Sequence, residues 1–168
     1  MILVAVGSNL PSRAGAPLAT CQAAVREMAA RGIAIRAIST WYETAPVPAS
    51  DQPWYVNGVV RVETQLSPHN LLGLLHVIEK DYERERGTPN AARTLDLDLL
   101  AYGSHVLGQG PLILPHPRLH ERAFVLLPLK DVAPDWAHAL TGQTPAEMIG
   151  ALPQGLENQG IRALSLNA

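Results

Sequence analysis

The chain has 168 residues, of which 47% are hydrophobic and 17% are charged. This size and composition predict one globular domain over residues 1–168 and argue against a disordered chain. The formal charge of −2 gives no general attraction to nucleic acids or anionic membranes. We expect a cytoplasmic protein, because the N-terminus lacks a basic signal region and no apolar run reaches the roughly 18 residues that span a bilayer.

The start of the chain predicts a strand followed by a helix. Residues 2–6 are continuously apolar, which indicates a buried strand that stops at Gly7. Pro17 opens a predicted helix that ends at Gly32 and carries one apolar stripe, formed by Leu18, Cys21, Val25 and Met28. The only cysteine belongs to this stripe, so we expect a small buried hydrophobe rather than a nucleophile.

Two further strands and a second helix are predicted next. Residues 33–42 indicate a strand with a bulge near Ala37 and Ile38. Residues 43–54 contain three prolines and predict an irregular loop, and a loop of this length is more often functional than idle. Residues 55–63 alternate again, with one face formed by Tyr55, Asn57, Val59 and Arg61. The second predicted helix is capped by Ser67, and we expect it to run to about Arg86.

Residues 93–100 carry the strongest chemical signal in the sequence. Leucines alternate with polar residues, so Thr94, Asp96 and Asp98 should share one face of a strand. The two carboxylates would lie roughly 7 Å apart. Burying like charges together is costly unless a cation lies between them, and hard oxygen ligands suit Mg²⁺. Arg93 supplies a further cation at the start of the strand. The plainer alternative is an ordinary polar strand face or an acidic edge.

The predicted order through residue 102 is strand, helix, strand, strand, helix, strand. This order predicts an α+β fold of the ferredoxin-like βαββαβ type, an antiparallel sheet with helices on one face. The other face is then open, and Asp96 and Asp98 can lie on it. Beyond residue 102 we expect C-terminal additions, among them an apolar segment at residues 124–129 and a helix at residues 144–152.

Four separated motifs together resemble one family, the 6-hydroxymethyl-7,8-dihydropterin pyrophosphokinases of folate biosynthesis. Residues 93–98 match the family's R-T-L-D-L-D signature. Pro115, His116 and Pro117, followed by the R-A-F-V-L run of residues 122–126, match a second signature. The G-S-N-L run at residues 7–10 and the block of residues 44–57 match the other two. The resemblance covers about residues 1–130.

The resemblance implies transfer of a pyrophosphoryl group from ATP to the hydroxymethyl group of a reduced pterin, with release of AMP. Asp96 and Asp98 would hold two Mg²⁺ ions that bridge the ATP phosphates. The same phosphates would be contacted by Arg84, Arg86, Arg93 and His116. Glu79 matches an acidic position on the family's second helix, although a surface ion pair is equally consistent with the sequence. We expect a monomer whose partners are these two small substrates.

The resemblance also implies a pterin pocket. Tyr55 and Phe124 would sandwich the ring, and Arg122 would flank the site. The side chain of Asn57 and the backbones near Thr44 and Val47 would bind the polar edge of the ring. Without the resemblance, Phe124 reads as a core aromatic and His116 as a hydrogen-bonded loop histidine.

The chain departs from the family pattern at residues 90–92, where Asn-Ala-Ala stands in place of the common W-G-P.

Three other functions make different demands on the sequence. A ferredoxin-like ligand-binding module without catalysis would not require Asp96 and Asp98. RNA binding is disfavoured, because the third strand lacks the basic and aromatic residues of the RNA-recognition motif. A two-metal nucleotide hydrolase would share the carboxylates and lack the pterin pocket.

Overall fold

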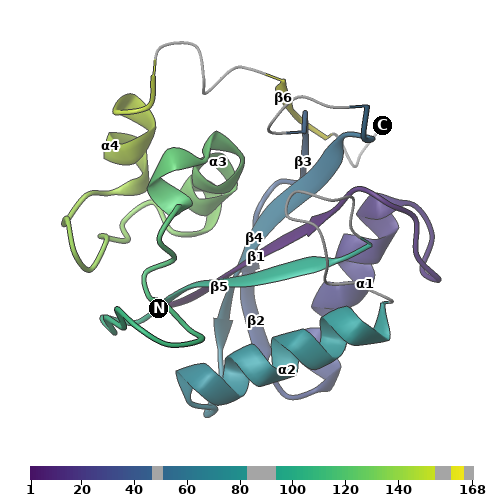
Figure 1. Cartoon of the computed structure of the whole chain (residues 1–168), viewed down its shortest axis with the longest axis horizontal. Helices are drawn as coiled ribbons and strands as arrows, with labels where there is room; N and C mark the ends of the chain where they lie inside the picture. Colours follow the sequence, from purple (N-terminus) through teal and green to yellow (C-terminus); the bar gives the residue numbers. More distant parts are fainter. Residues whose placement is uncertain (47–50, 83–93, 154–159, 165–168) are drawn as a thin grey trace.

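A computed structural model of the chain describes residues 1–46, 51–82, 94–153 and 160–164. Its elements in chain order are β1 (Ile2–Ser8), α1 (Pro17–Ala30), β2 (Ala34–Ile38), β3 (Tyr42–Thr44), β4 (Tyr55–Glu63), α2 (Pro68–Asp81), β5 (Asp96–Tyr102), the 3₁₀ turn η1 (Leu119–Glu121), α3 (Ala123–Val132), α4 (Pro145–Gly150) and β6 (Ile161–Ala163). The strands form one sheet in the order β5-β1-β4-β3-β6, with β2 also paired to β4 (Figure 1). All the pairings are antiparallel.

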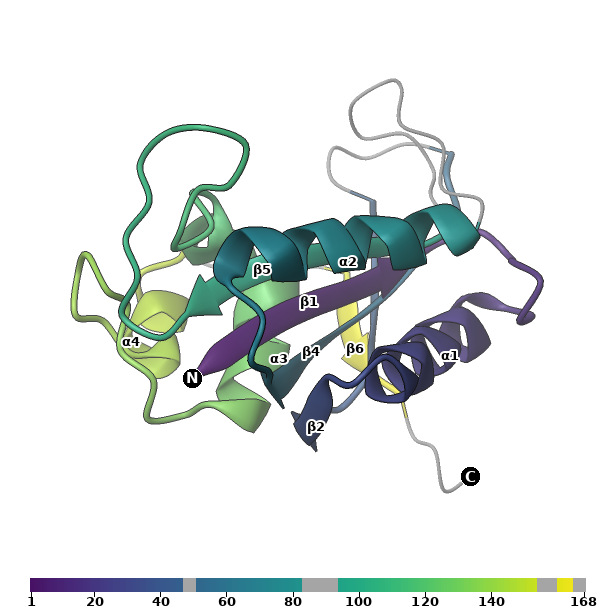
Figure 2. The same cartoon turned by 90° about the horizontal axis from the view of Figure 1, so that it is seen from below.

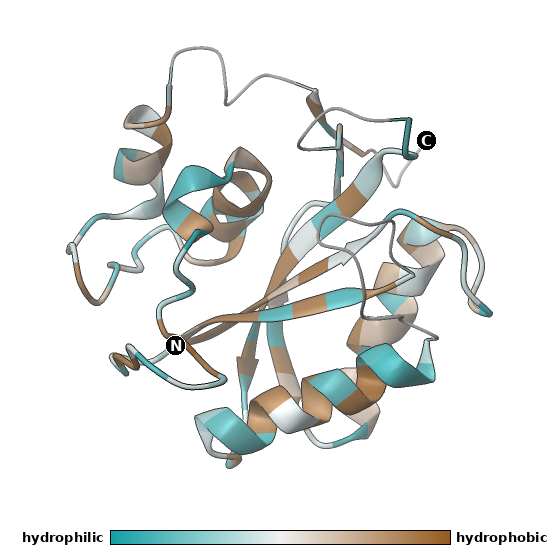
Figure 3. Ribbon diagram, in the orientation of Figure 1, coloured by the Kyte–Doolittle hydropathy of each residue, from teal (hydrophilic) through white to brown (hydrophobic). Residues whose placement is uncertain are grey.

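One face of the sheet carries the main hydrophobic core. Alternate residues of β1, β4 and β5 point to it, and Val4, Val60 and Leu97 are at most 2% exposed. Helices α1 and α2 cover this face, with Cys21, Met28, Leu71 and Leu75 buried against the strands. Figure 2 shows both helices on the same side of the sheet. In the hydropathy colouring of Figure 3, hydrophilic and hydrophobic bands alternate along α2.

The opposite face holds a second core at one end of the sheet. Leu3, Val59 and Leu100 are buried there under η1, α3 and α4. The ferredoxin-like α+β prediction is therefore confirmed, and the C-terminal additions cover part of the face that βαββαβ alone would leave open. The other end of this face carries Asp96, Gly7 and Asn57.

The prediction of one continuous strand over residues 33–42 was wrong. The segment is divided into β2 and β3, which both pair with β4 along the same edge. Between them the Trp41 ring packs so close to Gly58 that a Cβ on this glycine would lie 2.5 Å from the ring. The predicted bulge is confirmed nearby, between Ile35 and Ala37. An irregular loop was predicted over residues 43–54. Its first two residues instead belong to β3, which extends to Thr44.

Other boundaries also differ from the sequence prediction. Helix α2 ends at Asp81, five residues before the predicted end, and residues 83–86 lie outside the described part. The apolar segment predicted at residues 124–129 forms the middle part of helix α3. The late helix is confirmed as α4, with the Thr144 hydroxyl accepting the Glu147 N–H. The short strand β6 was not predicted.

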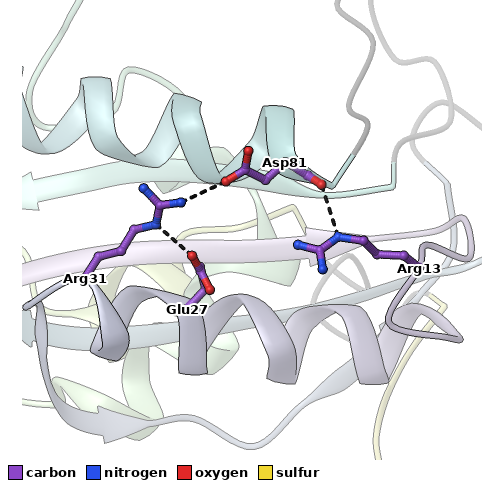
Figure 4. A network of polar contacts seen from close by, with 4 residues as sticks. All are labelled: Arg13, Glu27, Arg31 and Asp81. Atoms are coloured by element: carbon purple, nitrogen blue, oxygen red, sulfur yellow. Dashed lines mark hydrogen bonds and ion pairs between the residues drawn. The ribbon is translucent and has the colours of Figure 1, made fainter.

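A polar network ties the C-terminal end of α2 to α1 and to the loop before it (Figure 4). Arg31 forms ion pairs with Glu27 at 2.7 Å and with Asp81 at 2.9 Å. The Arg13 Nε donates to the Asp81 carbonyl at 3.2 Å. These contacts hold Asp81, the last residue of α2, against α1 and the loop before it. Within the described residues, no helix is long and apolar enough to cross a membrane.

Candidate active site

The candidate site is built on three neighbouring strands. In the sheet register, Gly7 of β1 pairs with Asp96 of β5 on one side and with Asn57 of β4 on the other. These three residues therefore form a row across the sheet, and all point to the face that α3 covers only in part. Asp98 lies two residues further along β5, on the same face.

Asp96 and Asp98 are partly exposed, while the leucines that alternate with them are buried. The predicted alternation of this strand is thus confirmed. No group of three or more His, Cys, Asp or Glu side chains that could hold a metal occurs in the described ranges. Two carboxylates suit Mg²⁺, which is usually held by one or two carboxylates and completes its shell with water and substrate phosphates.

Thr94 lies just before these carboxylates and adds a second observation. Its hydroxyl oxygen is buried and has no hydrogen-bond partner within the described part of the chain. Buried hydroxyls are almost always hydrogen-bonded. Asp96 and Asp98 thus share a strand segment with an unsatisfied hydroxyl, and this set of oxygen groups fits a Mg²⁺–nucleotide complex.

His116 is held at the far end of β5. Its backbone N–H donates to the Leu100 carbonyl at 2.8 Å, and its Nδ1 accepts the Arg118 N–H at 3.2 Å. In the neutral ring this assigns the proton to Nε2. The pKa of His116 is lowered to about 4, mainly by burial and then by the positive charge of Arg122; Asp96 acts in the opposite direction, and Arg118 adds a smaller lowering. Arg122 and Asp96 are therefore close enough to His116 to act on its charge.

The Asn57 side chain is oriented from two sides. Its Nδ2 donates to the Thr44 hydroxyl at 2.7 Å. On the other side, a Cβ added to Gly7 would lie 2.5 Å from the Asn57 Oδ1. Glycine at this position therefore leaves the space that the amide occupies. The predicted substrate residues Thr44 and Asn57 are in direct contact.

The predicted aromatic residues lie on different elements. Tyr55 begins β4, and Phe124 is in the first turn of α3. Phe124 is partly buried against the second core, so it is not a fully buried core aromatic. The guanidinium carbon of Arg122 lies 5.6 Å from the Phe124 ring centroid. Arg122 thus joins the predicted phosphate side of the site, at His116, to the predicted pterin side.

Glu79 does not lie on the surface, so a surface ion pair is wrong. Its side chain is 2% exposed, and its Oε2 accepts the Leu97 N–H at 2.9 Å. It therefore fixes the β5 backbone between the two aspartates. Four predicted site residues, Val47, Arg84, Arg86 and Arg93, lie outside the described residues.

Asn9 is a contributor that sequence reasoning missed. It is 1% exposed, and its Nδ2 donates to the Gln52 Oε1 and to the Pro53 carbonyl, each at 3.1 Å. It thereby holds the chain just before Tyr55 against the end of β1. Asn9 belongs to the G-S-N-L run that resembles a family motif, but the sequence did not indicate its contact with residues 52 and 53.

Comparison with known proteins shows which family the chain belongs to. A family model described as 7,8-dihydro-6-hydroxymethylpterin-pyrophosphokinase matches residues 3–134. A 2-amino-4-hydroxy-6-hydroxymethyldihydropteridine pyrophosphokinase of Methylorubrum extorquens is 38% identical over 154 residues, which are 90% of this chain and 94% of that protein. A mitochondrial folate synthesis bifunctional protein of Arabidopsis thaliana is 44% identical over 131 residues.

The match covers 78% of this chain and 23% of the Arabidopsis protein, so the chain spans about a quarter of that relative. A crystal structure of Plasmodium falciparum HPPK-DHPS superposes with a TM-score of 0.70, covering 89% of this chain and 43% of that one. At 14% identity, this likeness supports the fold alone. The match to the family model and the long match to the Methylorubrum enzyme show that the chain belongs to the 7,8-dihydro-6-hydroxymethylpterin-pyrophosphokinase family.

Proposed function

We propose that the chain transfers a pyrophosphoryl group from ATP to the hydroxymethyl group of 6-hydroxymethyl-7,8-dihydropterin. In this reaction the pterin hydroxyl oxygen bonds to the β-phosphorus of ATP. The bond between that phosphorus and the oxygen bridging to the α-phosphate breaks, and AMP leaves. The observation that carries the proposal is the row Asp96–Gly7–Asn57, in which a carboxylate and an amide lie on either side of one strand. We assign the carboxylate to the phosphate side of the site and the amide to the pterin side.

The spacing of the row supports two adjacent subsites. Neighbouring strands lie about 4.8 Å apart, so the backbones of Asp96 and Asn57 are separated by roughly 10 Å. Nucleotide phosphates above β5 and a pterin above β4 would then meet above Gly7, which has no side chain to obstruct them. Holding two reactants in contact is a main source of catalysis in phosphoryl transfer.

Asp96 and Asp98 are the proposed Mg²⁺ ligands, for two ions bound together with ATP. Mg²⁺ supplies charge neutralisation on the phosphates at this position. His116 would donate its Nε2–H to a phosphate oxygen, and Arg122 would add positive charge beside it. Arg84, Arg86 and Arg93 are proposed to bind the remaining phosphate oxygens. Glu79 would act on this side by fixing the β5 backbone.

The pterin would bind above β4. The Asn57 amide can donate to and accept from an amide-like ring edge, and the backbones near Thr44 and Val47 would complete that edge. Tyr55 and Phe124 are proposed to sandwich the ring. The Thr44 hydroxyl supports this assignment, because it accepts one hydrogen of the Asn57 amide and so limits the ways in which the amide can turn.

The decisive test is AMP formation from ATP and Mg²⁺ by the purified chain, with and without the hydroxymethyl dihydropterin. We expect AMP and the diphosphorylated pterin in equal amounts, and neither product when the pterin or Mg²⁺ is omitted. AMP formation without pterin would indicate a nucleotide hydrolase. Binding of both ligands without AMP formation would indicate a non-catalytic module.

A further inference from the structure

The C-terminal strand β6 lies beyond residues 3–134, which the family model matches. It pairs antiparallel with β3, so that Arg162 faces Glu43 and Ile161 faces Thr44. The ladder continues past both ends of β6: Ala45 N–H donates to the Gly160 carbonyl and Leu164 N–H donates to the Trp41 carbonyl, each at 2.8 Å. The three-residue strand β3 is therefore hydrogen-bonded on both edges, by β4 and by β6 (Figure 1).

The approach of β6 to the start of the 45–54 loop requires a glycine. Gly160 has a φ of +61°, a conformation that glycine adopts without strain. A Cβ on Gly160 would lie 2.6 Å from the Cβ of Ala45. Both the conformation and the close contact thus depend on this residue type.

Arg162 contacts both ends of the same loop. Its Nε and Nη2 each lie 2.7 Å from the Glu43 Oε2, and its guanidinium carbon lies 5.3 Å from the Trp54 ring centroid. Glu43 directly precedes Thr44, and Trp54 directly precedes Tyr55. One arginine therefore links the two points at which the chain enters and leaves the pterin subsite.

We propose that β6 is a positioning element for the pterin subsite and that Arg162 is the residue through which it acts. This inference rests on the proposed function. Thr44 and Tyr55 face each other in the β3–β4 pairing, and Arg162 adds a second link, outside this ladder, between the residues that directly precede them, Glu43 and Trp54. Thr44 in turn orients the Asn57 amide through the 2.7 Å hydrogen bond. The nucleotide side of the site, on β5, is separated from β6 by three strands, β1, β4 and β3, and is not part of this linkage.

The test is Arg162→Ala, assayed by calorimetry with the pterin in the presence of Mg²⁺ and a non-hydrolysable ATP analogue, and separately with the analogue alone. We expect pterin affinity to fall about five- to tenfold, the combined size of an exposed ion pair and a cation–π contact. Affinity for the ATP analogue should change by less than about twofold.

The chain offers a matched control. Arg36 and Glu63 form an equally short ion pair of 2.7 Å between neighbouring strands β2 and β4, at the other end of the sheet. Arg36→Ala removes an exposed ion pair of the same kind and should leave pterin affinity unchanged. The exchange of Glu43→Arg with Arg162→Glu should restore part of the lost affinity, because it restores the ion pair without the contact to the Trp54 ring.

Hydrogen exchange provides a readout that does not depend on activity. In Arg162→Ala, the amide of Ala45 should exchange faster than in the wild type, while amides in β5 should not. Unchanged pterin affinity, or equal losses for both ligands, would overturn the inference even if the wild type is active. If the wild type forms no AMP with the pterin, the proposed function fails, and an unchanged exchange rate at Ala45 would separately overturn the positioning role of β6.

Discussion

Gly7 is the residue at which the two proposed subsites meet. We expect Gly7→Ala to weaken pterin binding about tenfold, because its Cβ would lie 2.5 Å from the Asn57 Oδ1 and displace a hydrogen-bonding amide. Calorimetry with the pterin and with an ATP analogue measures the effect on each ligand. Gly73→Ala on α2 is the control, since an added Cβ meets no atom within 4 Å there. Pterin affinity that is unchanged in Gly7→Ala would contradict the assigned role of Asn57.

His116 predicts a pH dependence of stability in the ligand-free protein. Burial lowers its pKa from 6.5 to about 4, so between these values the unfolded chain binds more protons than the folded one. The contribution of His116 is therefore fully present above about pH 6.5 and is lost as the pH falls toward 4, by up to about 3 kcal/mol. Its magnitude is an upper bound, because the ring is partly exposed.

Urea unfolding of the wild type and of His116→Gln at pH 7 and pH 4.5 measures this contribution. We expect the wild type to lose more free energy of unfolding than the variant over this interval. His105→Gln provides the control, since His105 lies on the exposed turn after β5. Parallel losses in the wild type and His116→Gln would show that the imidazole is not buried as a neutral ring.

At the level of single residues, the sequence predicted which side chains share a strand face. It did not predict the contacts that surround individual side chains. The alternation of residues 94–99 was sufficient to place both aspartates on one strand face, because the period of a strand is a local property. The burial of Glu79 could not be predicted, because it depends on a hydrogen bond to Leu97 from a different element. The contact of Asn9 with Gln52 and Pro53 spans more than 40 residues and has no local pattern either.

Among the elements, β5 has one edge that no other described strand covers. The backbone N–H groups on this edge need hydrogen-bond acceptors from elsewhere. Within the described sheet β5 pairs only with β1, and the buried Glu79 accepts the Leu97 N–H on the other side. We expect Glu79→Ala to lower the free energy of unfolding by about 1–3 kcal/mol, because it leaves this N–H buried without an acceptor. Glu79→Gln keeps an acceptor oxygen and should cost less. Urea denaturation of both variants would test this, and equal losses would contradict the role of the hydrogen bond.

Strongly periodic elements were predicted well, whereas the short strands β3 and β6 were not predicted as separate elements. The stripe of α1 and the alternation in β4 follow from local spacing, and both match the observed burial. The division between β2 and β3 was missed because it depends on Trp41 packing against Gly58. The three-residue strand β6 has too little sequence of its own to show a pattern, and it exists because β3 offers it an edge.

For the molecule as a whole, the order of elements predicted the ferredoxin-like sheet, whereas the covering of its second face was not foreseen. Helices α3 and α4 bury the Leu3 end of that face and leave the Gly7 end to the site. The motifs at residues 7, 57, 96 and 116 are far apart in the chain, and nothing local specifies their distances. Their assembly follows from antiparallel register, which brings Gly7 between Asp96 and Asn57.

We propose that the nucleotide binds above β5 and the pterin above β4, the two strands that flank β1 in the sheet. Calorimetric titration of Asp96→Asn and Asn57→Ala, each with Mg²⁺–ATP analogue and with the pterin, tests it most directly. We expect a crossed result: Asp96→Asn should weaken nucleotide binding by at least about tenfold, and Asn57→Ala should weaken pterin binding by a similar factor. The pterin is titrated at an analogue concentration that saturates each variant, so that the two effects are separable. Equal losses of both ligands in both variants would contradict the two-subsite account.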